Sequence, residues 1–145
     1  MDYFDTSVLA AYYCPEPNSP AAEKIILHSE NPAISDLTEL ELASALSRKI
    51  REKFITRQDG GKIIALFQSH VSHGLFQKIV VEPEHFQIAR AWIAQFTTPL
   101  RSLDALHLAI ANKEKALFFT SDLQLVKAAR HFGINVKLVG NSVKP

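Results

Sequence analysis

The sequence has only one cysteine, Cys14, in 145 residues. A single cysteine excludes a disulfide within the chain and indicates a reducing compartment. The chain also lacks an uninterrupted apolar run of the roughly 18 residues that a membrane helix needs. Its first five residues show neither the basic nor the apolar part of a signal peptide. We therefore expect a soluble, cytoplasmic protein that does not enter a membrane.

An excess of one charge is lacking as well, because 16 lysines and arginines face 15 acids and the formal net charge is +1. This balance argues against indiscriminate binding of nucleic acid through overall charge, but it does not exclude local basic patches. No repeat, low-complexity tract or linker interrupts the sequence. At this length we expect one domain over residues 1–140, followed by a polar tail over residues 141–145.

Short apolar segments alternate with amphipathic segments along the chain. The expected strands cover residues 3–4, 33–35, 76–81, 117–120 and 135–139. The expected helices cover residues 8–13, 19–29, 37–53, 56–73, 83–96, 103–113 and 123–132. Strands that alternate with helices across short connections predict an α/β fold. We expect a three-layer α/β/α domain with a central, mainly parallel sheet flanked by helices.

Polar residues at the predicted helix starts indicate how three helices begin. Thr6-Ser7 should cap the helix that starts at Val8. Asp36, followed three residues later by Glu39, predicts an aspartate variant of the capping box. Ser102 should cap the helix over residues 103–113.

Three aspartates lie where predicted strands end or the next helices begin. Asp5 ends the first strand, Asp122 follows the strand over residues 117–120, and Asp104 lies in the first turn after Ser102. Because ligands of open parallel sheets bind outside the carboxyl ends of the strands, we expect these acids near one edge. Capping and the helix dipole would by themselves explain Asp104 and Asp122. They explain Asp5 less well, since a buried strand rarely ends in an acid without a partner.

Glu41 lies on a stripe of the helix over residues 37–53 that is otherwise apolar or small. The other members of the stripe are Leu37, Leu40, Ser44 and Ala45. A carboxylate in such surroundings is costly unless it is paired or bound to a metal. A salt bridge to Arg48 or Lys49 is the alternative explanation.

Acids that converge at strand ends repel one another unless some keep their protons or a cation neutralises them. The four candidates are Asp5, Glu41, Asp104 and Asp122. Carboxylates without a companion cluster of cysteine or histidine suit Mg²⁺ or Mn²⁺ better than Zn²⁺. Sites of this kind typically perform phosphoryl chemistry.

Four segments carry a resemblance to a known family. They are Phe-Asp-Thr-Ser at 4–7, the helix at 37–46, Leu-Arg-Ser-Leu-Asp-Ala-Leu-His-Leu-Ala at 100–109 and Phe-Thr-Ser-Asp at 119–122. In this order, and over nearly the whole chain, they resemble the motifs of VapC-type PIN domains. Those proteins are the toxin halves of bacterial type II toxin–antitoxin (VapBC) systems.

The resemblance implies a PIN-like fold and an endoribonuclease that cleaves phosphodiester bonds of RNA with Mg²⁺ or Mn²⁺. It implies that the catalytic and metal-binding acids are Asp5, Glu41, Asp104 and Asp122. Thr6 and Thr120 match the hydroxyl positions beside these acids, where they could orient ligands or water. The resemblance further implies a homodimer and a cognate VapB-like antitoxin.

Basic residues near the predicted site are candidates for RNA contact. Arg48, in a basic run that continues to Arg57, and Arg101, next to Ser102, could hold phosphates. A solvated helix face explains the basic run equally well. His107 lies one helical turn beyond Asp104 and could move a proton, although a hydrogen-bonded core histidine is the simpler interpretation.

Three other functions stay open. A phosphatase of the haloacid-dehalogenase type also begins with a strand-end aspartate, but it needs a second acid two positions later, where this chain has Ser7. A catalytically silent PIN-like module would bind RNA or a protein partner, although retention of all four acids argues against decay of the site. A DNA-directed nuclease of related fold would need the added helices that larger flap nucleases use, and the chain is too short for them.

Overall fold

Five parallel strands form the centre of the molecule. In the computed structural model, which describes residues 1–141, the strand order is β3-β2-β1-β4-β5. The strands are β1 (Asp2–Phe4), β2 (Pro32–Ser35), β3 (Gln77–Ile79), β4 (Leu117–Thr120) and β5 (Val136–Leu138). Each strand runs parallel to its neighbours, and β1 occupies the middle. The predicted α/β class with a parallel sheet is confirmed.

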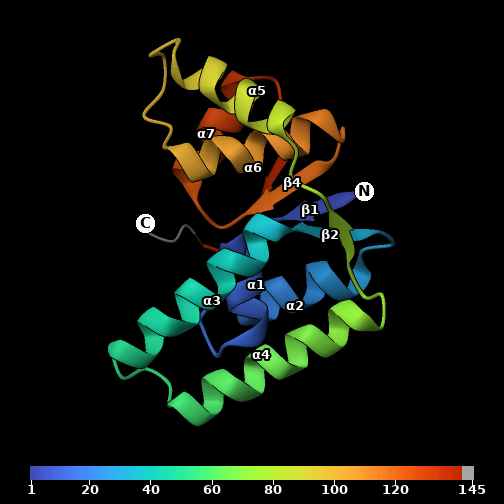
Figure 1. The fold of residues 1–145 in the computed structure, drawn as a ribbon, viewed down its shortest axis with the longest axis vertical. Helices are drawn as coiled ribbons and strands as arrows, with labels where there is room; N and C mark the ends of the chain where they lie inside the picture. The colour runs from blue at the N-terminus through green and yellow to red at the C-terminus, as the bar shows by residue number, and fades with distance from the viewer. Residues whose placement is uncertain (142–145) are drawn as a thin grey trace.

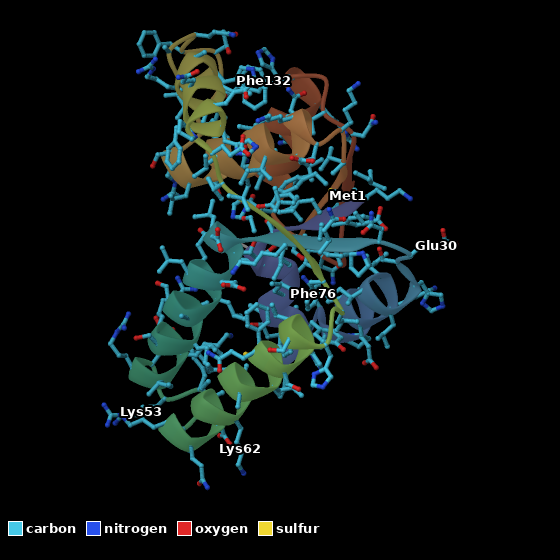
Figure 2. The ribbon with its side chains drawn as sticks, turned by 45° about the vertical axis from the view of Figure 1, so that its right-hand side comes forward. Met1, Glu30, Lys53, Lys62, Phe76 and Phe132 are labelled. Atoms are coloured by element: carbon cyan, nitrogen blue, oxygen red, sulfur yellow. The ribbon has the colours of Figure 1, made fainter. Side chains whose placement is uncertain are left out.

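Helices cover both faces of this sheet. They are α1 (Thr6–Tyr13), α2 (Ser19–His28), α3 (Asp36–Arg51), α4 (Arg57–Ser72), α5 (Pro83–Ile93), α6 (Ser102–Lys113) and α7 (Leu123–His131). Figure 1 shows α1 to α4 on one side of the sheet and α5 to α7 on the other. Phe76 lies with the first group and Phe132 with the second (Figure 2). Within residues 1–141, no helix is long and apolar enough to cross a membrane.

The central strand sends successive side chains into two different cores. Tyr3 packs with Phe118 on the side of α6 and α7, and Phe4 packs with Phe119 on the side of α1 and α3. This alternation follows from the two-residue period of a strand. Tyr3 and Phe4 are both fully buried, and burial of such a side chain contributes about 1.5–3 kcal/mol. The two cores thereby fix where β1 ends, and with it the position of Asp5.

Asp5 itself caps α1, which corrects the predicted cap at Thr6-Ser7. Its backbone is extended (φ −79°, ψ 176°), and its carboxylate accepts a hydrogen bond from the Val8 amide at 3.2 Å. Thr6 and Ser7 lie inside the first turn, where their hydroxyls are free to contact other groups. One side chain therefore ends the strand, starts the helix and faces the edge of the sheet.

The start of α3 differs from its prediction as well. Ser35 is the N-cap and forms a reciprocal capping box with Thr38, so the cap lies one residue earlier than predicted. Asp36 and Glu39 instead form ion pairs with Lys78 at 2.9 and 3.3 Å. At α6 the N-cap position belongs to Arg101, without a side-chain cap bond, and Ser102 is the first helical residue.

Leu40 is 70% exposed, so the predicted apolar stripe of α3 is wrong at this position. The buried residues of the helix are Leu37, Thr38, Leu42 and Leu46. Glu41 therefore lies at the border of the buried face, half-buried, where one side of its carboxylate can reach the pocket described below.

The predicted tail lies outside the described residues except for Asn141, whose backbone is tied to Asn18. The side-chain Nδ2 atom of Asn18 donates to the backbone carbonyl of Asn141 at 2.8 Å, and its Oδ1 atom accepts from the backbone amide of Asn141 at 3.0 Å. Gly140, with φ +66°, lets the chain approach so closely that a Cβ atom there would lie 2.4 Å from the Asn18 Oδ1 atom.

Candidate functional site

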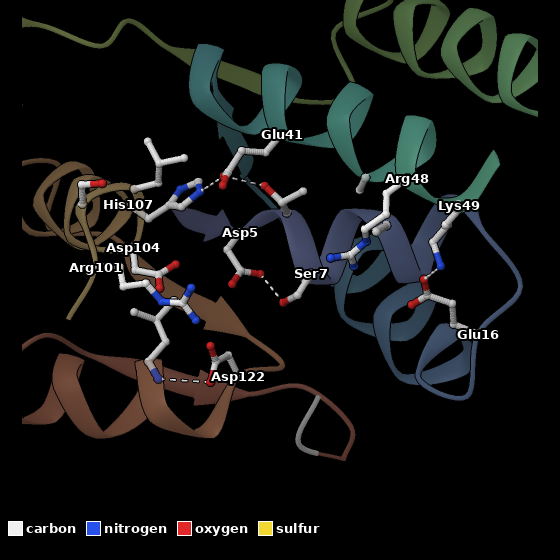
Figure 3. Close-up of a pocket in the computed structure, with 16 residues that line it drawn as sticks. Asp5, Ser7, Glu16, Glu41, Arg48, Lys49, Arg101, Asp104, His107 and Asp122 are labelled. Atoms are coloured by element: carbon white, nitrogen blue, oxygen red, sulfur yellow. Dashed lines mark hydrogen bonds and ion pairs between the residues drawn. The ribbon is translucent and has the colours of Figure 1, made fainter. Parts of the chain in front are cut away.

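Four acids from four different elements line one pocket of about 480 Å³ at the carboxyl ends of β1 and β4. Asp5 follows β1, Asp122 follows β4, Asp104 lies in the first turn of α6, and Glu41 lies in α3. Figure 3 shows Asp5 between Glu41 on one side and Asp122 on the other. The structure thus brings together all four acids that the sequence singles out.

Asp5 is the most deeply buried of them, at 5% exposure. Its carboxylate accepts hydrogen bonds from the Ser7 and Thr120 hydroxyls, both at 2.5 Å, and from the Val8 amide. Burial raises the pKa of Asp5, while the nearby His107 and these hydrogen bonds to the charged form act in the opposite direction. All three donors are electrically neutral, so they orient the carboxylate without cancelling its charge.

Hydroxyl groups extend this arrangement from Asp5 toward Asp122. The Thr120 hydroxyl donates to Asp5 and accepts from the Asp122 amide at 3.1 Å. The Ser7 hydroxyl accepts from the Ser121 amide at 3.0 Å. Thr120 therefore lies where the sequence places it, whereas Ser7 was not predicted as part of the site.

Glu41 is held from two helices. Its Oε1 atom accepts from the Thr6 hydroxyl at 2.8 Å and also contacts the Nε2 atom of His107. The alternative of a salt bridge within α3 is wrong: Lys49 pairs with Glu16 at 2.6 Å, and within residues 1–141 the ion-pair partner of Glu41 is His107, not Arg48. Burial by itself would raise the pKa of Glu41, but the hydrogen bond and the charge of His107, together with the Thr6 hydrogen bond, outweigh burial and lower the pKa.

His107 contacts Glu41, a partner that the sequence did not reveal. It is 2% exposed, and its Nδ1 atom lies 2.7 Å from the Tyr3 hydroxyl. The expectation of a hydrogen-bonded core histidine is confirmed, but its partners include Glu41. The available signal was its position three residues after Asp104, which places both side chains on one face of α6.

Asp104 and Asp122 are less restrained than the other two acids. Asp122 caps α7 through Oδ1, which accepts from the amides of Gln124 at 2.9 Å and Leu125 at 3.4 Å. Asp104 has no side-chain hydrogen bond within residues 1–141, so capping does not explain it. Burial raises its pKa; His107 acts in the opposite direction, and the charges of Asp122, Asp5 and Glu41 raise the pKa further.

Basic side chains line the same pocket. Arg101 lies on the side of Asp104 and Asp122, and Arg48 lies on the far side, beyond Ser7 (Figure 3). Both are exposed, as contacts with a phosphate backbone require. Thr6 also borders this space.

A second groove, of about 900 Å³, adjoins the acidic pocket. The two share Glu16, Arg48 and Lys49. Phe54, which is 74% exposed, and Ile55 form part of its apolar wall. A molecule bound in this groove would lie beside the acids.

The donor set of the acidic pocket fits a hard divalent cation. Four carboxylates border one space, and neighbouring negative charges raise the pKa of Asp104, which a cation would reverse. Within residues 1–141, no group of three potential ligands is already close enough to hold a metal. Binding of a cation would therefore have to draw the acidic side chains together.

Comparisons with known proteins agree with this fold. A family model for the PIN domain matches residues 3–131. VapC20 from Mycobacterium tuberculosis, described as a sarcin–ricin loop cleaving toxin, superposes with a TM-score of 0.72 at 16% identity, covering 88% of this chain and 95% of that one. DNA-bound VapBC from Salmonella typhimurium gives 0.71 at 17% identity, covering 97% and 99%.

A third structure, VapBC2 from Rickettsia felis bound to a promoter DNA fragment, gives a TM-score of 0.69 at 17% identity and covers 95% of this chain and 98% of that one. At these identities the likeness is one of fold. A comparison with curated protein sequences gives no significant match.

Proposed function

Because the chain belongs to the PIN-domain family, we propose that it is a metal-dependent endoribonuclease and the toxin of a VapBC-type toxin–antitoxin pair. The observation that carries this proposal is the convergence of four acids on one pocket at the carboxyl ends of β1 and β4. A pocket lined by so many carboxylates suits a divalent cation and a phosphodiester substrate.

In this proposal the cation is Mg²⁺ or Mn²⁺, held by Asp5, Glu41, Asp104 and Asp122. When bound, such an ion supplies a water nucleophile at neutral pH and positive charge opposite the phosphoryl oxygens. The protein's own contribution is to orient the acids. Thr120 does so for Asp5, and Thr6 does so for Glu41.

Arg48 and Arg101 would hold phosphates of the RNA strand on either side of the acids. Both are exposed and both line the pocket, so they can attract a polyanion that the acids alone would repel. Single-stranded RNA is the substrate class that fits this arrangement, because an unpaired strand can bring one phosphate down among the acids while its neighbours stay at the rim.

The partners in this proposal are a cognate VapB-like antitoxin and a second copy of the chain, in the cytoplasm. The structural neighbours from Salmonella typhimurium and Rickettsia felis are VapBC assemblies, which supports an antitoxin partner. The groove beside Phe54 supports it further, because it shares Arg48 and Lys49 with the acidic pocket. A segment bound there could reach the acids and block them.

The direct test is cleavage of total RNA by the purified chain, free of bound partner, in Mg²⁺ or Mn²⁺ and in EDTA. We expect discrete fragments from the wild-type protein and none from Asp5→Asn or in EDTA. Glu30→Gln is the matched control, because Glu30 is exposed and precedes β2 at the opposite end of the sheet (Figure 2). Thermal unfolding of each variant shows whether it is folded.

The same assay separates the alternatives. Cleavage of DNA oligonucleotides but not of matched RNA would favour a DNA-directed nuclease, and hydrolysis of phosphomonoesters alone would favour a phosphatase. Failure to cleave either nucleic acid, with metal bound and the fold intact, would refute the nuclease and favour a catalytically silent PIN-like binding module.

A further inference from the structure

A chain of buried hydrogen bonds leads from the end of β2 through the core to Glu41. The Ser35 hydroxyl lies 2.8 Å from the Tyr3 hydroxyl, which lies 2.7 Å from Nδ1 of His107, and Nε2 of His107 contacts Glu41. Tyr3 and Ser35 are fully buried, and His107 nearly so. Buried polar groups of this kind are costly unless each is satisfied, so their arrangement constrains every member.

For a neutral His107 ring, the hydrogens in this chain have one consistent direction. The ionised Glu41 carboxylate can only accept, so Nε2 of His107 must carry a hydrogen. The Tyr3 hydroxyl has one hydrogen to donate to Nδ1, and the Ser35 hydroxyl has one to donate to Tyr3. Ser35 in turn accepts from the Thr38 amide at 3.4 Å. Each hydroxyl is then used once as donor and once as acceptor, and the chain points toward Glu41.

The two carboxylate oxygens of Glu41 have different roles in this arrangement. Oε1 receives two donors, Thr6 from α1 and His107 from α6, so the carboxylate is held from two directions. Oε2 has no hydrogen-bond partner in the described part of the chain. A carboxylate fixed through one oxygen keeps the other available at the pocket (Figure 3).

We propose that Tyr3 and His107 are positioning residues for Glu41: the Tyr3 hydroxyl orients the His107 ring with its hydrogen on Nε2, and His107 then orients Glu41 to bind a divalent cation. This inference rests on the proposed metal-dependent function and adds a role for two core residues. Such outer partners of metal ligands typically change metal affinity by roughly 10- to 100-fold when they are removed.

The chain offers a matched pair of variants for the test. Tyr3→Phe removes only the hydroxyl that contacts His107. Tyr13→Phe removes a hydroxyl that lies 2.7 Å from Nδ1 of His70, the same kind of contact, between α1 and α4. Neither Tyr13 nor His70 lines the acidic pocket. Both variants keep the aromatic ring, and thermal unfolding of each confirms that it folds.

The first measurement is Mn²⁺ affinity, followed by electron paramagnetic resonance of the free ion and without RNA. We expect Tyr3→Phe to weaken binding about tenfold and Tyr13→Phe to stay within about twofold of the wild type. A general loosening of the fold would affect both variants, whereas positioning of Glu41 affects only the first. Equal Mn²⁺ affinities for Tyr3→Phe and the wild-type protein would overturn the proposal.

The second measurement reports on His107 directly. Nitrogen-15 spectra recorded without metal at neutral pH should show Nε2 protonated and Nδ1 as an unprotonated acceptor, and the Nδ1 resonance should shift in Tyr3→Phe. A hydrogen found on Nδ1 in the wild-type protein would overturn the proposed direction.

A second pair of variants tests the role of His107 without changing Tyr3. The side-chain amide of His107→Gln can still donate to Glu41, whereas His107→Leu cannot. We expect the glutamine variant to recover most of the Mn²⁺ affinity that the leucine variant loses; equal losses would contradict positioning by a hydrogen bond.

Failure of the function and failure of this inference look different. If the wild-type protein binds no Mn²⁺, the metal site fails and the positioning role falls with it. If the wild-type protein binds Mn²⁺ and cleaves RNA while Tyr3→Phe behaves identically, the function stands and only the positioning role is refuted.

Discussion

Replacement of Asp104 by asparagine should stabilise the metal-free protein and destabilise the protein in Mg²⁺, relative to the wild type. Asp104 carries a charge that is half-buried, lacks a hydrogen bond within residues 1–141, and faces three other acids. Asparagine has nearly the same shape and no charge, so it relieves the repulsion while removing one candidate metal ligand. The two effects on stability have opposite signs, and the net effect of the substitution depends on whether Mg²⁺ is present.

The pH dependence gives the sign of the first effect. Burial and the neighbouring charges raise the pKa of Asp104 above its ordinary value of 3.8, so the folded protein holds this proton to higher pH than the unfolded chain does. The free energy of unfolding therefore falls as pH rises through the interval between the two pKa values. The advantage of Asp104→Asn should be present at neutral pH and absent well below pH 3.8.

The expected size is that of a typical stabilising substitution, about 0.5–2 kcal/mol in EDTA. For a chain of this length that is about 3 °C in Tm per kcal/mol. Mg²⁺ at 100 times its Kd would stabilise the wild type by about 2.7 kcal/mol, whereas a variant that no longer binds Mg²⁺ at this concentration would gain nothing; the difference exceeds the first effect. The order of the two melting temperatures should therefore reverse between EDTA and Mg²⁺.

Differential scanning calorimetry in both buffers measures these shifts, with Glu30→Gln as the control for loss of an exposed acid. A lower Tm for Asp104→Asn than for the wild type in EDTA would refute the proposed repulsion. Equal stabilisation of both proteins by Mg²⁺ would refute Asp104 as a ligand.

Two further changes probe the rim of the pocket and the end of the described chain. Arg101→Ala should raise KM for RNA and lower the salt dependence of binding by about one counterion, with kcat nearly unchanged. Arg130→Ala, which changes an arginine outside the pocket, should change neither KM nor the salt dependence. A loss of kcat alone in Arg101→Ala would contradict a phosphate contact. Both Gly140→Ala and Gly74→Ala put an alanine at a positive φ, which costs about 1–3 kcal/mol. Gly140→Ala should lower the free energy of unfolding in urea by more, because only its Cβ atom would also collide with Asn18. Equal losses of stability would exclude that contact.

The strands and helices could be predicted because their signals are local. The segment Leu117–Thr120 matches β4 to the residue, and the predicted helix over residues 123–132 matches α7 to within one residue. Boundaries differ from the predictions where polar and apolar residues mix. The predicted strand over residues 76–81 retains only Gln77–Ile79, and the predicted helix over residues 83–96 ends at Ile93.

The helix caps show why local signals can mislead. Asp36 and Glu39 have the spacing of a capping box, but Lys78 on β3 pairs with both, and Ser35 takes the cap. That ion pair depends on the sheet, since β3 lies beside β2 and is distant in sequence. A choice between two adjacent polar residues as cap therefore cannot be made before the strand order is known.

The positions of the acids could be predicted for a reason that does not extend to the residues that orient them, such as His107 and Tyr3. Strand ends in a parallel sheet share one edge, so Asp5 and Asp122 are placed by topology alone. The contacts of His107 with Glu41 and Tyr3 span 66 and 104 residues. No periodicity in the sequence encodes such pairings, and an apolar run around His107 favours a core residue whichever partner it has.

The groups that donate hydrogen bonds to Asp5 and Glu41 share a property that matters for binding a cation. Asp5 and Glu41 are oriented by hydroxyls, a backbone amide and an imidazole, while the arginines and the lysine that line the pocket form no ion pair with either acid within residues 1–141. An ammonium or guanidinium group in those places would orient the acids equally well, but it would compete with a divalent cation for their charge. Hydroxyl, amide and imidazole donors fix two ligands in advance without placing the permanent cation of a lysine or arginine beside them. Asp104 and one oxygen of Asp122 can then adjust, which is what a site without a preformed cluster of three ligands requires.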